Sequence, residues 1–139
     1  MLDGENGAAT FKQLMRMSRV PGTDSEFLVL DHAALRAVDV KTRKVTTIAG
    51  TMVGERYWTS GQSALESLPG ALSVGGGYYA NGIGSRAGFY WPAGLAVSPD
   101  GTMVAVADKF NRRARLRCAL CDRIGTLSGK GLCRREIAF

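Results

Sequence analysis

Short apolar runs, separated by turn-forming residues, recur along the chain. In the second half, residues 94–97 and residues 103–107 form two such runs around a turn in which Pro99 precedes Gly101. Proline favours the start of a tight turn and glycine its end, so this pattern predicts a β-hairpin. The same reasoning predicts strands at residues 15–18, 27–30, 35–39, 45–49, 94–97, 103–107, 113–118 and 124–128. Between these strands only residues 62–68 are compatible with a helix, so the expected fold class is all-β.

The chain is an imperfect repeat of itself. Aligning its two halves places Phe11 on Phe89 and, after a slip of one residue, Asp31 on Asp108. Each copy has the ~40–50 residues expected of one propeller blade. The start of the first copy is degenerate, because Leu14 stands where the second copy has a proline. We therefore divide the chain into a first repeat, an insertion containing Gly and Ser, a second repeat and a tail, at residues 3–50, 51–80, 81–129 and 130–139.

The insertion lacks the alternation of apolar and polar residues that strands show. It contains the turn-forming pairs Ser60-Gly61 and Pro69-Gly70 and a run of three glycines. A connection of this length in a compact domain is typically functional or disordered. We interpret it as an exposed loop between two blades, with a deteriorated blade as the alternative that its length leaves open.

The second repeat resembles the NHL repeat, which forms one blade of a β-propeller. The matching residues are Phe89, Trp91-Pro92-Ala93-Gly94-Leu95-Ala96-Val97, Pro99-Asp100-Gly101, Val106-Ala107-Asp108 and Asn111. Residues 45–50 resemble the final strand of such a blade, and residues 125–129 are a weaker copy of it. The resemblance implies a partial β-propeller of about two four-stranded antiparallel blades, joined by a long loop.

A closed propeller has about 4–8 blades, and repeat arrays generally need at least three units. Two blades cannot close, so the resemblance implies a fragment of a longer propeller whose remaining blades belong to a parent chain. The strand at residues 113–118 departs from the family pattern because it carries more arginines.

Composition places the chain among ordinary globular proteins. It is 45% hydrophobic and 22% charged, which argues against disorder. No apolar run reaches the 18 residues of a membrane-spanning helix, and residues 1–20 lack the pattern of a signal peptide. With cysteines read as reduced thiols, these features favour an intracellular location.

Cysteine and histidine do not combine into a convincing metal site. Cys118 and Cys121 form a C-x-x-C pair, with Cys133 further on and His32 far upstream. A structural zinc needs four ligands at suitable spacing, and a redox pair favours a helix N-terminus. Small buried thiols are the preferred interpretation, and we predict neither a metal nor a cofactor.

Catalysis is not expected from this chain. Because His32 is the only histidine, the multi-histidine centres of lyase-type propellers cannot form here. Asp31 and Asp108 could be read as a catalytic pair. Their equivalent positions in the two repeats instead predict one structural aspartate per repeat, hydrogen-bonded to turn amides.

The arginines near the end of the second repeat are the candidate binding residues. These residues are Arg112, Arg113, Arg115 and Arg117. Strand alternation places the last three on one face and Ala114, Leu116 and Cys118 on the other. If the arginine face is exposed, it can contact the phosphates of single-stranded RNA; the alternative is a solvated face without a ligand.

The sequence therefore favours a non-catalytic interaction module, an NHL propeller scaffold that binds a protein partner. Single-stranded RNA binding through the arginines is one alternative. A fragment of a lyase-like or hydrolase-like propeller enzyme is another, and it would need polar residues from blades outside this chain.

Overall fold

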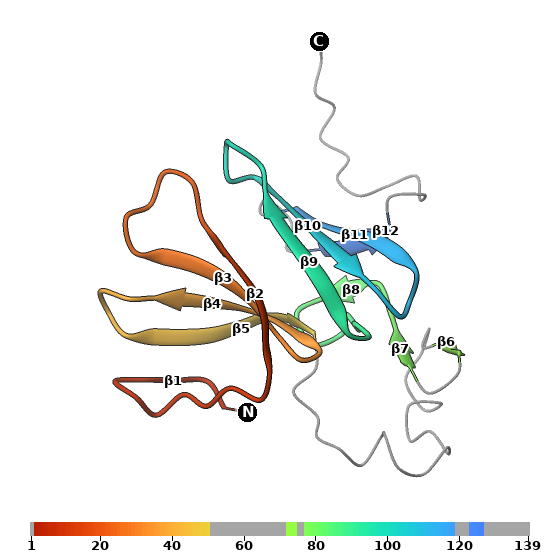
Figure 1. The fold of residues 1–139 in the computed structure, drawn as a ribbon, viewed down its shortest axis with the longest axis horizontal. Coiled ribbons are helices and arrows are strands. Elements are labelled where there is room, and N and C mark those ends of the chain that lie inside the picture. The colour runs from red at the N-terminus through yellow and green to blue at the C-terminus, as the bar shows by residue number, and fades with distance from the viewer. Residues whose placement is uncertain (1, 51–71, 75–76, 119–122, 127–139) are drawn as a thin grey trace.

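The computed structural model describes residues 2–50, 72–74, 77–118 and 123–126. Every regular element in this part of the chain is a β-strand, so the predicted all-β class is confirmed. Two five-stranded antiparallel sheets account for most of it (Figure 1). Sheet 1 consists of β1 (Gly4–Glu5), β2 (Leu14–Arg19), β3 (Glu26–Asp31), β4 (Ala34–Asp39) and β5 (Lys44–Gly50). Sheet 2 consists of β8 (Gly82–Ile83), β9 (Pro92–Val97), β10 (Met103–Asp108), β11 (Arg113–Cys118) and β12 (Arg123–Thr126).

The two sheets have the same topology. Their strand orders are β1-β5-β4-β3-β2 and β8-β12-β11-β10-β9. In each sheet four consecutive strands form a meander, and a short strand from the preceding segment pairs with the last of them. The expected four strands per repeat were therefore one too few. Strands of two residues are too short to leave an alternating pattern in the sequence.

The predicted strands agree with the observed ones wherever the structure describes them. The hairpin of β9 and β10 and the arginine-bearing β11 lie where the pattern placed them. The insertion contains a small hairpin, β6 (Leu72–Val74) and β7 (Gly77–Tyr79), which the sequence did not predict. Residues 51–71 and 75–76, the tail at 130–139, and Cys121 and Cys133 lie outside the described residues. No helix in the described ranges is both long and apolar enough to cross a membrane.

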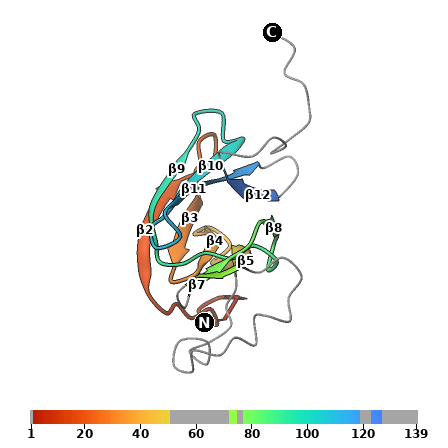
Figure 2. The same ribbon diagram turned by 90° about the vertical axis from the view of Figure 1, so that its right-hand side faces the viewer.

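The core lies between the two sheets. Residues paired across neighbouring strands point to the same side of a sheet, so the register identifies each face. One face of sheet 1 and one face of sheet 2 meet, with β2 beside β9 (Figures 1 and 2). The buried side chains of this interface are Leu28, Leu30, Leu35 and Ala49 from sheet 1, and Ala87, Phe89, Val104, Val106 and Ile124 from sheet 2 and its preceding segment.

The turn between β9 and β10 is organised by Asp100. Its carboxylate accepts hydrogen bonds from the hydroxyl of Ser98 and from the backbone N–H and hydroxyl of Thr102, at 3.1 Å and 2.8 Å for the latter two. Gly101 follows with a φ of +71°, a conformation that glycine adopts without steric cost. The hydrogen bonds from Ser98 and Thr102 lower the pKa of Asp100 from its ordinary 3.8 to about 2.

This turn should contribute to acid sensitivity. Because the folded pKa of Asp100 is lower than the unfolded one, its stabilising contribution is complete above about pH 4 and is lost as the pH falls towards 2. We expect Asp100→Asn to unfold with a shallower pH dependence than wild type between these values. Urea unfolding at a series of acidic pH values checks this, and carboxyl NMR titration gives the pKa directly. If the unfolding free energy changes equally with pH in both proteins, the lowered pKa is not a property of Asp100.

Candidate interaction surface

A buried arginine holds the N-terminal segment against sheet 1. The side chain of Arg36, on β4, is fully buried and pairs with the buried Asp31 at 2.9 Å. Its guanidinium also donates to the backbone carbonyls of Thr10 and Leu2 and to the carboxylate of Asp3. The ring of Phe11 covers the guanidinium at 4.6 Å. The carbonyls of Thr10 and Leu2 also accept each other's backbone N–H groups, so the arginine adds a second donor to each and fixes this bridge against β4.

Arg115, on β11, makes the equivalent contacts in sheet 2. It is fully buried, pairs with Asp108 at 3.1 Å, and lies 5.4 Å from the ring of Phe89. Its other acceptors are the carbonyls of Gly88 and Ala80 and the side-chain oxygen of Asn81. Each arginine therefore joins its strand to the segment that precedes its sheet. Of the guanidinium nitrogens of Arg36 and Arg115, only the two Nε atoms lack an acceptor among the described residues.

The two aspartates have the structural role that the repeat predicted. Asp31 accepts hydrogen bonds from the backbone N–H groups of Lys12 and Gln13, and Asp108 accepts one from the N–H of Tyr90. Burial raises the pKa of Asp108, although the donors Asn111, Tyr90 and Arg115 act in the opposite direction. Both carboxylates are fully enclosed by these partners, which makes them unsuitable for acting on a substrate.

The prediction that these arginines share an exposed face is wrong for Arg115, the middle residue of the three on β11. The register confirms that Arg113, Arg115 and Arg117 share one face of β11. That face also carries Val104 and Val106 of β10, however, and it is turned towards sheet 1. Arg115 is completely buried and Arg117 is half-buried, so only Arg112 and Arg113 of the four candidate residues are exposed. The burial has a physical cause: the neighbouring valines place this face in the core, the carboxylate of Asp108 neutralises Arg115, and three neutral oxygens accept its remaining hydrogen bonds.

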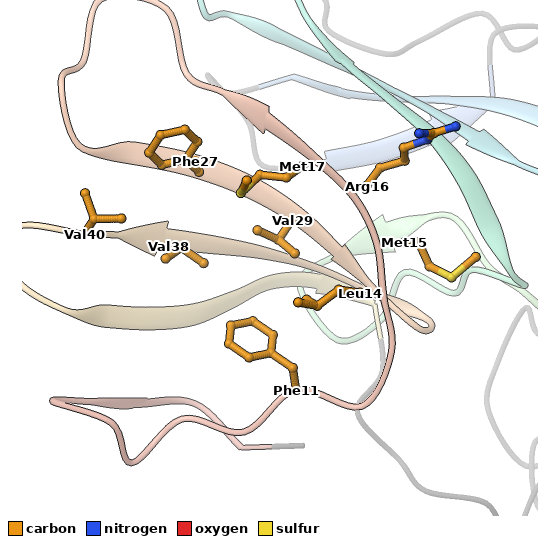
Figure 3. Close-up of a pocket in the computed structure, with 9 residues that line it drawn as sticks. All are labelled: Phe11, Leu14, Met15, Arg16, Met17, Phe27, Val29, Val38 and Val40. Carbon is orange, nitrogen blue, oxygen red and sulfur yellow. The ribbon is translucent and has the colours of Figure 1, made fainter.

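The most distinctive surface is the face of sheet 1 that points away from sheet 2. Figure 3 shows its apolar side chains gathered over β2, β3 and β4. They surround a hollow with a volume of about 510 Å³. Met15 and Arg16 also line this hollow, but Arg16 is directed towards sheet 2, where its Nε donates to the carbonyl of Ala93. We call the remaining lining residues the open face: Phe11, Leu14, Met17, Phe27, Val29, Val38 and Val40.

The open face is unusually exposed for side chains of this kind. Leu14 and Met17 keep 61% and 66% of their surface accessible, and Val40 keeps 55%. Val29 lies at the bottom of the hollow and is buried. Single exposed apolar residues are common, whereas a contiguous exposed apolar patch marks an interaction site. The sequence carries part of this signal, because β3 contains a continuous apolar run, residues 27–30, that supplies apolar side chains to both faces of sheet 1.

A second feature missed from the sequence is an aromatic cluster at one end of the sheets. The ring of His32, in the β3–β4 turn, lies 5.7 Å from that of Trp91, and Trp91 lies 6.1 Å from the exposed Phe110. Phe110 also contacts Tyr90 at 5.2 Å. His32 therefore lies in a turn, and its ring packs on the second repeat. The cluster ties the end of sheet 1 to the start of β9.

Among the described residues, no three His, Cys, Asp or Glu side chains come together in a way that could hold a metal ion. Cys118, at the end of β11, is buried. No protein-family model and no curated protein matches this chain.

Proposed function

We propose that this chain is a non-catalytic interaction module, made of two consecutive blades of NHL β-propeller type, that binds a protein partner through the open face. The blade assignment is supported by the sequence motifs together with two sheets of identical strand order and an identical buried arginine. The binding role is supported by one observation above all, the apolar hollow on sheet 1.

The chemistry of the open face favours a protein surface as its ligand. Its defining side chains are all apolar, and they spread over three strands instead of enclosing a small volume. Burying a side chain such as Met17 or Phe27 contributes about 1.5–3 kcal/mol, so a partner that covers several of them gains substantial affinity. A phosphate backbone, in contrast, needs basic side chains, and the strand that was expected to present them buries Arg115.

The other two hypotheses have less support. Single-stranded RNA binding now depends on Arg112 and Arg113 alone among the exposed candidates. An enzyme would need a group of polar side chains open to a substrate, whereas Asp31 and Asp108 are occupied by structural partners.

Site-specific photo-cross-linking tests the proposal in the cells that produce the protein. A benzophenone-bearing amino acid replaces Met17 on the open face or, as a control, Ile83, which is 57% exposed on β8. We expect a protein adduct from position 17 and none of comparable yield from position 83. Adding Leu14→Glu should reduce the adduct at position 17 about tenfold or more, because a charge cannot be buried in an apolar interface without a large penalty. Absence of any protein adduct at position 17 would overturn the proposal.

A further inference from the structure

The two sheets pack on one another through non-equivalent faces. Arg36 and Arg115 occupy the same position in their sheets and therefore mark equivalent faces. In sheet 2 the arginine-bearing face, with Val104 and Val106, packs against sheet 1. In sheet 1 the arginine-bearing face, with Phe27 and Val29, is the open face. The open face is thus the counterpart of a surface that is already covered by a β-sheet elsewhere in the same chain.

The face of sheet 1 that packs on sheet 2 also has an equivalent face in sheet 2, and that face does not contact sheet 1. Sheet 1 covers sheet 2 with the face that carries Leu28 and Leu30. By register, the equivalent face of sheet 2 points away from sheet 1. Three of its residues are exposed and two are half-buried. We call it the alanine face: Ala96, Ala105, Ala107, Ala114 and Leu116.

We propose that the open face binds the alanine face of a second copy of this chain, so that the sheet-on-sheet contact inside the chain is repeated between chains. This inference rests on the proposed function and identifies the partner. The side chains of the two surfaces are complementary in size, since Met17 and Phe27 project from one and methyl groups form most of the other. Large side chains against small ones allow two layers to interdigitate without voids.

Such a contact is head-to-tail. The open face of one copy contacts the alanine face of the next. A pair of copies therefore still has one unoccupied open face at one end and one unoccupied alanine face at the other. Head-to-tail contacts close into a ring when the rotation between copies permits and otherwise extend. Assembly should therefore increase with concentration, and it should stop when either surface is blocked.

Two exposed positions allow each surface to be blocked separately. Met17→Glu places a charge on the open face, and Ala96→Glu places one on the alanine face; both side chains point to solvent, so the fold should tolerate them. Sedimentation velocity is measured over a range of concentrations for wild type, each variant, their equimolar mixture and the double variant. Thermal unfolding of every protein verifies that each variant is folded.

We expect wild type to exceed the mass of a monomer as its concentration rises, while each single variant stays monomeric. The mixture should form a one-to-one complex, because Ala96→Glu retains the open face and Met17→Glu retains the alanine face. The double variant should bind neither single variant. A monomeric wild type, a monomeric mixture, or an Ala96→Glu variant that assembles like wild type would each overturn the inference. If the inference fails while position 17 still cross-links to another protein, the proposed function stands without it.

Discussion

Replacing Arg115 with methionine is expected to lower the free energy of unfolding by about 3–5 kcal/mol, the typical cost of removing one partner from a buried ion pair. The substitution would leave the carboxylate of Asp108 buried without its cation. It would also remove the guanidinium donor from the carbonyl of Gly88 and one of the two donors to the carbonyl of Ala80, which keeps the N–H of Gly88. The segment before sheet 2 should separate from β11 as a result. Urea unfolding followed by Trp fluorescence measures the loss.

Arg113→Met is the matched control, because Arg113 lies on the same face of the same strand but is exposed. Its effect should stay within about 0.5 kcal/mol. The Arg115→Met variant should also recover stability at lower pH. Without the cation the folded pKa of Asp108 rises further, so the folded state binds a proton more readily than the unfolded state and gains stability as the pH falls. Equal losses of unfolding free energy for both methionine variants would show that the ion pair between Arg115 and Asp108 does not stabilise sheet 2.

Gly50→Ala is expected to destabilise the protein by about 2–5 kcal/mol, combining a strained backbone with overpacking. Gly50 ends β5 with a φ of +92°, and its N–H donates to the carbonyl of Gly84 at 3.2 Å, across the junction between the sheets. A Cβ atom there would lie 2.3 Å from the carbonyl oxygen of Ala33 and 3.0 Å from the ring of Phe89. Because the first of these neighbours is backbone, it cannot move aside without disturbing β4.

Gly7→Ala separates the two causes of this destabilisation. Gly7 has the same φ of +92°, but nothing lies within 4 Å of the position that its Cβ would take. The Gly7→Ala variant should lose about 1–2 kcal/mol of unfolding free energy, from the strained backbone alone. The difference in unfolding free energy between the two variants therefore measures the close approach at the junction. Equal losses of unfolding free energy in the two variants would show that the backbone at Ala33 does not approach Gly50 as closely as the structure indicates.

Local patterns in the sequence were sufficient to locate the strands. Apolar alternation and the turn residues Pro99 and Gly101 gave the β9–β10 hairpin, since both signals act over a few residues. The same rules separate the faces of a strand but do not tell which face is buried. Arg115 illustrates this limit, because its burial is decided by Val104 and Val106 on the neighbouring strand and by carbonyls at positions 80 and 88.

Part of the site could have been found by comparing the repeats more closely. Asp31 and Asp108 were recognised as equivalent, and an arginine follows each of them within seven residues. A recurring acid and base at fixed strand positions indicates a structural pair. The open face was harder to predict, because Phe27 and Val29 read as ordinary core residues until the layers are assembled. Only the arrangement of the two sheets reveals that one layer is left uncovered.

The pairing of β1 with β5 has a consequence for the order in which the protein folds during synthesis. All strand pairs of sheet 1 join residues between positions 4 and 50, so this sheet can close as soon as Gly50 has left the ribosome. At about 5–20 residues per second, the residues of β12 follow roughly 4–15 seconds later. During that interval the nascent chain exposes the apolar side chains of both faces of sheet 1. The speed of translation between the two repeats, and the chaperones present at the ribosome, should therefore determine how much of the protein reaches its folded state.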